Sequence, residues 1–230
     1  MAVADCPLAP ADTLAPVLAR RFPPGEVEVV VDAAGAVHAA DDEPVLARAA
    51  GREWRLSPGV FWQVHPALPD VLATVVGEFA AAPRGGTAWD LYGGVGLFAA
   101  VLAGQVGQDG SVTVVESAQA AVDDGRAALA DLPQIGWRVG RVEKVLAGLP
   151  ANPDVVVADP PRKGLGRAVV GALAAHGPAR VVYVACDPAA LARDVAFFAD
   201  QGYTLDALRA FDAFPMTHHM ECVALLTPRR

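Results

Sequence analysis

The chain has 230 residues, of which 53% are hydrophobic, and its 26 acidic against 18 basic side chains give a formal net charge of −8. This length suits one substantial domain, or one domain with an appendage, and the acidic balance argues against a generally basic nucleic-acid-binding surface while leaving room for a local basic patch. Gly, Pro and charged residues interrupt every apolar run, so no run is long enough to span a bilayer.

The first sixty residues predict a small α+β appendage. Residues 26–39 read as a β-hairpin around a turn at 32–35, and residues 52–56 read as a further strand. We therefore expect an appendage at 1–60 and a larger domain at 61–230.

Short apolar strands and helices alternate regularly from residue 87 onwards. Such alternation predicts βαβ units and a mostly parallel sheet, which is an α/β fold. A polar loop separates the last two predicted strands, so the sheet should end in a hairpin-like pair. The predicted strands are 87–91, 111–115, 135–139, 154–158, 180–185, 203–208 and 221–226, and the predicted helices are 66–82, 97–103, 118–132, 142–149, 167–176 and 189–200.

A glycine-rich turn, with Gly94 and Gly96, follows the predicted strand 87–91 and opens a helix. Glycines there allow a tight turn and let the backbone approach a ligand. Glu116 ends the next predicted strand, where a carboxylate can accept hydrogen bonds from ribose hydroxyls. Together they predict a nucleotide-type cofactor, although a glycine turn alone can simply cap a strand.

Two residues at this turn bear on which cofactor binds. Tyr92 stands where the dinucleotide fingerprint has its first glycine, and Asp90 precedes it. A carboxylate in that place would repel a pyrophosphate but attract the ammonium group of an amino acid. S-adenosylmethionine has such an ammonium and carries no phosphate. The alternative is that Asp90 only stabilises a turn or the start of the helix.

Two further predicted strands are followed by residues that could contact a substrate or react with it. Asp159 begins Asp159-Pro160-Pro161-Arg162 after one strand, in either a simple turn or a substrate-facing loop, and Cys186 follows the next strand. The N-terminus of the helix that starts at Asp187-Pro188 is expected to lower the thiol pKa, with Asp187 partly opposing it. The alternative for Cys186 is a buried structural cysteine.

Glu221, at the start of the last strand, is a candidate general base. His218 and His219 precede it, but a histidine pair near a turn is more often structural, and no third ligand suggests a metal site.

Five segments in chain order resemble the RNA uracil-C5 methyltransferase family, which uses S-adenosylmethionine on tRNA or ribosomal RNA. The likeness runs over about residues 55 to 227. The segments are Phe61-Trp62-Gln63-Val64-His65-Pro66, Asp90-Leu91-Tyr92-Gly93-Gly94-Val95-Gly96-Leu97-Phe98, Asp159-Pro160-Pro161-Arg162, Val182-Tyr183-Val184-Ala185-Cys186-Asp187-Pro188 and Phe214-Pro215-Met216-Thr217-His218-His219-Met220-Glu221.

The resemblance implies a Rossmann-like sheet typical of S-adenosylmethionine-dependent methyltransferases. It implies that Cys186 is a nucleophile toward uracil C6 and that Glu221 removes the C5 proton after methyl transfer. The target uridine must be unstacked to reach them. The residues that the resemblance assigns to the cofactor pocket are Gln63, Tyr92, Glu116 and Asp159.

The sequence departs from this family in several places. It has Gly93-Gly94 for the usual Cys-Gly, Asp187 for Asn beside the nucleophile, and His65 for Asn. The family's N-terminal RNA-binding β-barrel and the four cysteines of its iron–sulfur cluster have no counterpart, although Cys6 resembles the last of those cysteines. We therefore expect a C-terminal fragment or a naturally short member, with residues 1–60 a remnant of a central domain.

These observations set the remaining expectations. Only three widely spaced cysteines, Cys6, Cys186 and Cys222, argue for a reducing, cytoplasmic setting, and the N-terminus does not resemble a signal peptide. We expect no iron–sulfur cluster in this chain, no membrane partner, and an RNA substrate bound weakly. Two alternatives stay open: a methyltransferase for another substrate, and a non-catalytic cofactor-binding module.

Overall fold

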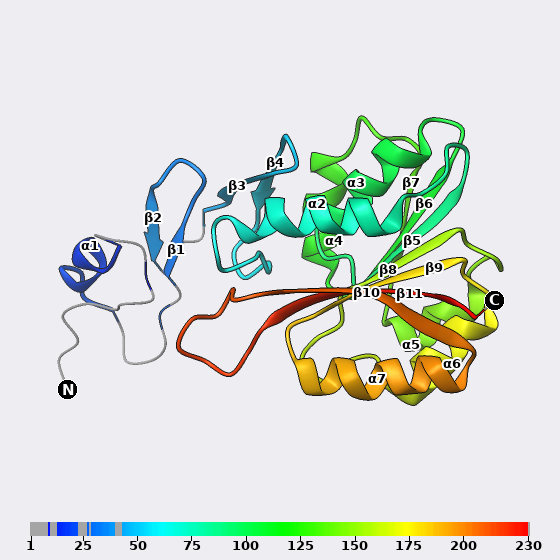
Figure 1. The fold of residues 1–230 in the computed structure, drawn as a ribbon. Helices are drawn as coiled ribbons and strands as arrows, with labels where there is room; N and C mark the ends of the chain where they lie inside the picture. The colour runs from blue at the N-terminus through cyan, green and yellow to red at the C-terminus, as the bar shows by residue number, and fades with distance from the viewer. Residues whose placement is uncertain (1–8, 10–12, 23–26, 28, 40–42, 230) are drawn as a thin grey trace.

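A seven-stranded sheet forms the centre of the computed structural model, which describes residues 9, 13–22, 27, 29–39 and 43–229 (Figure 1). The strand order is β10-β11-β9-β8-β5-β6-β7. Neighbours from β7 to β9 pair in parallel, whereas β11 is antiparallel to both β9 and β10. This order confirms the predicted Rossmann-like α/β sheet with its final hairpin. The strands are β5 (Thr87–Leu91), β6 (Ser111–Glu116), β7 (Ile135–Val139), β8 (Val155–Ala158), β9 (Arg180–Ala185), β10 (Tyr203–Phe211) and β11 (Glu221–Pro228).

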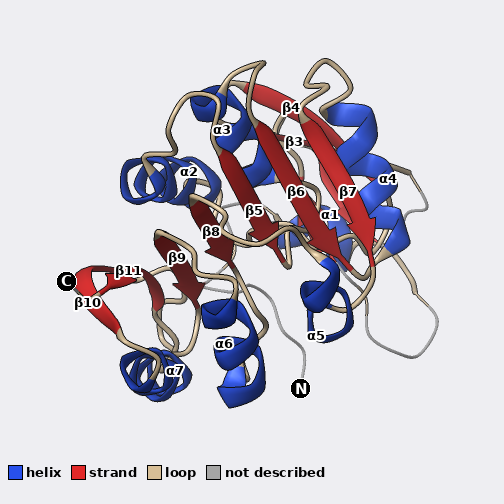
Figure 2. Ribbon diagram, turned by 90° about the vertical axis from the view of Figure 1, so that its right-hand side faces the viewer, coloured by secondary structure: helices blue, strands red, loops and turns tan. Residues whose placement is uncertain are grey.

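Helices cover both faces of the sheet (Figures 1 and 2). One face carries α2 (Leu68–Ala80), α3 (Leu97–Val106) and α4 (Gln119–Ala128). The other carries α5 (Val142–Val145), a 3₁₀ turn at Leu146–Gly148, α6 (Gly166–Ala175) and α7 (Pro188–Asp200). The right-handed crossovers of parallel strands require this two-sided arrangement.

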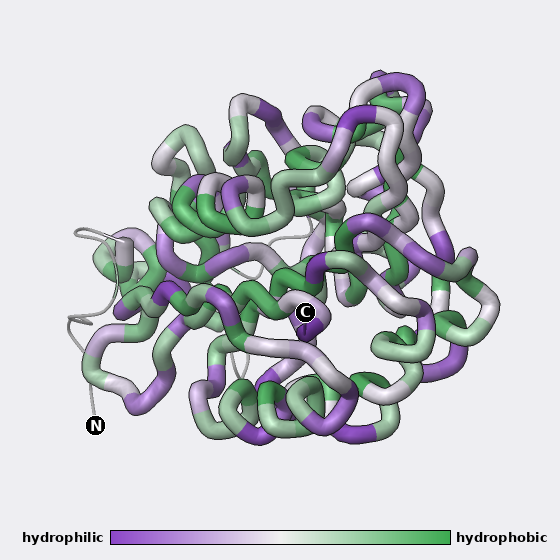
Figure 3. Tube along the Cα trace, turned by 45° about the vertical axis from the view of Figure 1, so that its right-hand side comes forward, coloured by the Kyte–Doolittle hydropathy of each residue, from purple (hydrophilic) through white to green (hydrophobic). Residues whose placement is uncertain are grey.

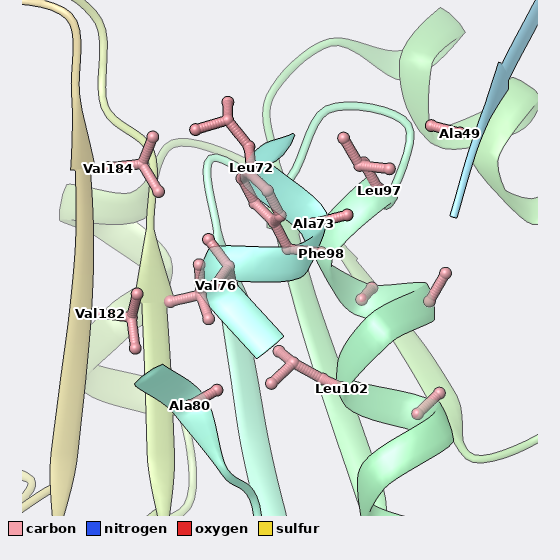
Figure 4. Packing of buried hydrophobic residues seen from close by; sticks show 14 of the residues in the cluster. Ala49, Leu72, Ala73, Val76, Ala80, Leu97, Phe98, Leu102, Val182 and Val184 are labelled. Carbon is pink, nitrogen blue, oxygen red and sulfur yellow. The ribbon is translucent and has the colours of Figure 1, made fainter. Parts of the chain in front are cut away.

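Two hydrophobic clusters fill the space between the sheet and its helices, and β9 contributes to both by simple alternation. Val182 and Val184 pack toward α2 and α3 (Figure 4). Val181 and Tyr183 pack toward α6 and α7 on the other face. Hydrophobic positions accordingly follow the central strands, and hydrophilic ones lie mostly along outer loops (Figure 3).

Most boundaries agree closely with the sequence predictions. The predicted strands 87–91, 135–139 and 180–185 match β5, β7 and β9 residue for residue. The largest difference among the strands of the sheet is β10, which continues to Phe211 rather than ending at 208, because β11 supplies hydrogen-bond partners along the added residues. The predicted helices 118–132 and 142–149 are shorter than expected and end at Ala128 and Val145.

The N-terminal part contains a short helix, α1 (Leu14–Leu18), and two hairpins. The predicted hairpin is present as β1 (Val29–Val31) paired with β2 (Val37–Ala39), although residues 26 and 28 of its first strand lie outside the described residues, as does Cys6. The predicted strand 52–56 is β4 (Arg52–Leu56), and its partner β3 (Val45–Ala49) was not predicted.

The β3–β4 hairpin packs on the larger domain. Trp54 is fully buried in the same cluster as α2 and α3. Arg52 pairs with Asp131 (2.7 Å), three residues after the end of α4, and the Ser57 backbone N–H donates to Asp124 (2.7 Å) within α4. The boundary after residue 60 stays a prediction. Among the described helices, none is long and apolar enough to cross a membrane.

Candidate active site

The glycine turn lies at the carboxyl end of β5 and is open on one side only. A Cβ on Gly93 would lie 2.6 Å from Val114 and 3.0 Å from the carboxyl carbon of Asp90, so a larger residue there would require these side chains to move. Gly94 and Gly96 have φ of +53° and +83°, a conformation that favours glycine. Nothing lies within 4 Å of the Cβ position of Gly94, so a ligand can approach the backbone from that side.

Asp90 supports this turn from beneath. Its carboxylate is fully buried, and one oxygen accepts a hydrogen bond from the Ala99 N–H (2.8 Å) in the first turn of α3. The other oxygen, Oδ1, has no hydrogen-bond partner among the described residues. Burial raises the pKa of Asp90 to about 7, and the nearby charge of Glu116 adds to the effect. The helix-stabilising alternative is thus observed, while ammonium binding stays a prediction.

Glu116 joins the turn to the end of β6. One carboxylate oxygen accepts from the Gly94 N–H (3.0 Å), and the other accepts from the N–H groups of Ser117 (2.5 Å) and Ala118 (2.7 Å). The carboxylate therefore lies beside the open face of the turn, where the sequence predicted contacts to ribose hydroxyls. Those contacts remain a prediction.

Tyr92 also has a left-handed backbone, with φ of +60°. Its half-buried phenol packs against the cluster on the α5–α7 face, and burial together with Glu143 raises its pKa to about 12. The phenol therefore stays protonated at neutral pH and can donate a hydrogen bond.

Trp54 is a site residue that the sequence reasoning missed. Its indole N–H donates to the Val95 carbonyl (3.0 Å) inside the glycine turn, and its ring packs at 5.4 Å and 44° against Trp62, the neighbour of Gln63. The hairpin thereby connects the segment of Gln63 to the turn. The only sequence signal was a tryptophan in a short alternating strand, which is more often a core residue.

Three acidic side chains gather at the carboxyl edge of the sheet. The strand neighbours Leu91, Ala158 and Cys222 pack on the α5–α7 face, so alternation directs Asp90, Asp159 and Glu221 to the opposite face. Burial raises the pKa of Asp159 well above its usual range, and the charges of Glu221 and then Asp90 raise it further. Burial alone raises the pKa of Glu221, which is 3% exposed, to about 7.

Cys186 lies beside these acids. It follows the last residue of β9, and the antiparallel register pairs Cys222 with Ala185, so Glu221 starts β11 next to Cys186. Cys186 is half-buried and is one of the residues that line a narrow crevice. The other residues lining that crevice are Pro160, Pro161, Arg162, Gly164, Tyr183, Ala185, Asp187 and Ala190.

The expected lowering of the thiol pKa by the α7 N-terminus is not what the structure gives. Burial raises the pKa of Cys186, and Glu221 and Asp159 raise it further. The helix start cannot compensate because Asp187 already occupies it, accepting the Ala190 N–H at 2.7 Å. The thiol is therefore protonated in the free protein at neutral pH.

The histidine pair lies in the loop before β11. The rings of His218 and His219 are 4.2 Å apart, and His219 contacts Phe214 edge-on. Within the described part of the chain, no group of three or more His, Cys, Asp or Glu could hold a metal ion. Gln63 is half-buried, and no described contact joins it to Cys186 or Glu221.

Comparisons with known proteins agree with this geometry. Residues 150–229 match the family model for tRNA (uracil-5-)-methyltransferases. The chain is 48% identical over 186 residues to an uncharacterized RNA methyltransferase of Streptomyces avermitilis, covering 80% of this chain and 43% of the relative. The chain belongs to the uracil-5-methyltransferase family.

Other similar proteins extend the comparison. An uncharacterized RNA methyltransferase of Streptomyces coelicolor is 48% identical over 196 residues, covering 84% of this chain and 43% of the relative. The crystal structure of the Pyrococcus abyssi tRNA (uracil-54, C5)-methyltransferase in complex with S-adenosyl-L-homocysteine superposes with a TM-score of 0.68 and 28% identity, covering 84% of this chain and 47% of that one. The chain thus spans less than half the length of these relatives.

Trp54→Phe should weaken binding of S-adenosylhomocysteine by about fivefold, because an unsatisfied buried carbonyl at Val95 costs about 1 kcal/mol or more and loosens the turn. Calorimetric titration measures the Kd. Trp89→Phe is the control, since it removes the same volume from the cluster on the other face. Equal affinities for the Trp54 variant and wild type would contradict a role for this indole.

Alkylation of Cys186 by iodoacetamide should increase as pH rises through the raised pKa of the thiol. Glu221→Gln removes a negative neighbour, favours the thiolate and should move this profile to lower pH. Mass spectrometry of the Cys186 peptide gives the rate at each pH. Asp200→Asn, at the far end of α7, should leave the profile unchanged; a Glu221→Gln profile that also does not move would exclude the electrostatic coupling.

Proposed function

We propose that this protein transfers a methyl group from S-adenosylmethionine to C5 of a uridine in tRNA or ribosomal RNA, through a covalent bond between Cys186 and C6. The observation that carries the proposal is the adjacency of a half-buried thiol and a buried carboxylate with a pKa of about 7, on neighbouring strands at one edge of the sheet. Such chemistry needs both a nucleophile and a separate proton acceptor.

The glycine turn suits this cofactor. The open face of Gly94, the carboxylate of Glu116 beside it and the unpartnered oxygen of Asp90 offer an approach for a ribose and an ammonium group. When bound, S-adenosylmethionine supplies an electrophilic methyl group on a positively charged sulfur. The Pyrococcus abyssi neighbour, whose crystal structure contains S-adenosyl-L-homocysteine, supports this choice.

The residues of the chain then have defined tasks. The Cys186 thiol loses its proton to solvent water, and the resulting thiolate sulfur adds to uracil C6, which leaves an enolate with electron density at C5. After C5 has gained the methyl group, Glu221 takes the C5 proton, the electron pair re-forms the C5–C6 double bond, and the C6–S bond breaks. Asp159, at the end of β8, lies within electrostatic reach of both groups and is proposed to line the pocket.

Several finer points belong to the same proposal. Gln63, Asp90, Tyr92, Gly94, Gly96, Glu116 and Asp159 would form the cofactor pocket. RNA as the partner is supported by relatives that are named RNA methyltransferases. A cytoplasmic location follows from such a substrate.

A 5-fluorouridine RNA stem-loop, mixed with the protein and S-adenosylmethionine, should accumulate a covalent protein–RNA adduct, because fluorine at C5 cannot leave as a proton. Denaturing gels and intact mass measure the adduct. Cys186→Ala should abolish it, whereas Cys222→Ala, which alters the neighbouring thiol, should not. Binding of S-adenosylhomocysteine without an adduct on any tRNA or ribosomal RNA fragment would favour a non-catalytic module, and an adduct in Cys186→Ala would exclude this nucleophile.

Glu221→Gln should trap an adduct on ordinary uridine, because general-base removal of the C5 proton contributes about 10²–10⁴-fold and its loss blocks release. Quench-flow sampling of the adduct over time measures the release rate. Glu78→Gln, which alters an exposed carboxylate of α2 that pairs with Arg209 (2.6 Å), is the matched control and should release product normally. Wild-type release rates in Glu221→Gln would remove it as the base.

A further inference from the structure

We propose that Asp194 is a positioning residue which, together with Tyr183, holds the β8–α6 loop against the tip of β9 and so fixes Asp159 and Arg162 opposite Cys186. The inference rests on the proposed function for its catalytic meaning. Its structural content concerns a separate, buried polar cluster on the opposite face of the sheet from the three acids.

Asp194 is a buried carboxylate with an unusual number of donors. It belongs to α7, it has no solvent exposure, and its oxygens accept from the Tyr183 hydroxyl (2.8 Å) and the Leu165 N–H (2.7 Å). The Gly166 N–H lies 3.3 Å away, and the guanidinium of Arg193 donates at 2.9 and 3.0 Å. A buried charge persists only where donors satisfy it, so this cluster is well determined.

Asp194 and its donors come from three different parts of the fold. Tyr183 lies in β9, three residues before Cys186; Leu165 and Gly166 end the loop that begins with Asp159; and Asp194 lies in the helix that starts two residues after Cys186. Burial and the bond to Asp194 raise the pKa of Tyr183, so its hydroxyl stays the donor. The cluster thus joins both walls of the Cys186 crevice.

The loop itself is shaped to meet this cluster. Gly164 has φ of +73°, and a Cβ there would lie 2.9 Å from the Tyr183 hydroxyl and closer still to Asp194. The Gly164 N–H closes a turn on the Pro161 carbonyl (2.8 Å), and Arg193 donates to the Lys163 carbonyl (2.7 Å). The loop is therefore anchored at three consecutive stretches of backbone directly after Arg162.

This arrangement does more than stabilise a core. An apolar side chain in place of Asp194 could fill the same volume. It could not accept hydrogen bonds from the Leu165 and Gly166 N–H groups, and such bonds fix the loop because their geometry is directional. The carboxylate therefore fixes the position of the β8–α6 loop relative to β9. Loss of that position would leave the fold intact and change the geometry around Cys186.

Two variants and one matched control test this role. Asp194→Asn keeps the shape but replaces one acceptor oxygen with a donor, which leaves at least one of the N–H groups unpaired. Tyr183→Phe removes one hydroxyl. Tyr203→Phe removes an equally buried hydroxyl bond, to the Pro178 carbonyl at 2.9 Å, at the far edge of the sheet.

Three measurements separate loop loosening from general unfolding. Hydrogen exchange of peptides covering residues 159–167 should become faster in Asp194→Asn and Tyr183→Phe, and remain as in wild type in Tyr203→Phe. Alkylation of Cys186 should become faster in the same two variants while the buried Cys222 stays protected. Adduct formation with 5-fluorouridine RNA should fall by about 100-fold in Asp194→Asn, since a misplacement of about 1 Å costs that much.

The outcomes are decisive in both directions. Unchanged loop exchange in both variants, or alkylation of Cys222 rising together with that of Cys186, would overturn the positioning role. If wild type itself forms no adduct, the proposed function fails, yet exchange and alkylation still decide whether the cluster holds the loop.

Discussion

The antiparallel insertion of β11 between β9 and β10 is the constraint on which the candidate site depends. Parallel strands deliver Asp159 and Cys186 to one edge of the sheet by their carboxyl ends. Because β11 runs the other way, it brings its first residue, Glu221, to that same edge, and the pairing of Cys222 with Ala185 fixes its height. A slip of one residue would turn the carboxylate to the opposite face. The backbone hydrogen bonds of a sheet therefore set the distance between the proposed nucleophile and the proposed base.

Buried acidic groups gather at this same edge of the sheet, and their burial and mutual repulsion change their protonation. Burial raises the pKa values of Asp159 and Cys186, and the neighbouring charge of Glu221 makes ionisation of both still harder. Glu221 reaches a pKa of about 7 from burial alone. A carboxylate with that pKa can accept a proton and lose it again at neutral pH, whereas an exposed glutamate would hold protons too weakly.

The sequence predicted the centre of the sheet well because β8 and β9 are nearly continuous apolar runs rich in Val, buried on both faces and with prolines close to either end. It predicted Cys186 and Glu221 as candidate site residues because the segments around them mark the ends of strands. It could not predict the sign of the thiol pKa shift, since that depends on Glu221 and Asp159, distant in sequence. Trp54 and Asp194 were missed for a similar reason: their partners, Val95 and Leu165, are backbone groups that leave no trace in residue identity.

The indole of Trp54 also makes the β3–β4 hairpin and the glycine turn a single thermodynamic unit. Any ligand that binds the ordered turn more tightly than the loosened turn must, by reciprocity, hold the hairpin more firmly in place. Part of the free energy of such binding would then appear as protection of residues 45–56 from local unfolding, some forty residues away in sequence. The region that unfolds together with the glycine turn would therefore include residues 45–56, although the sequence predicts a domain boundary after residue 60.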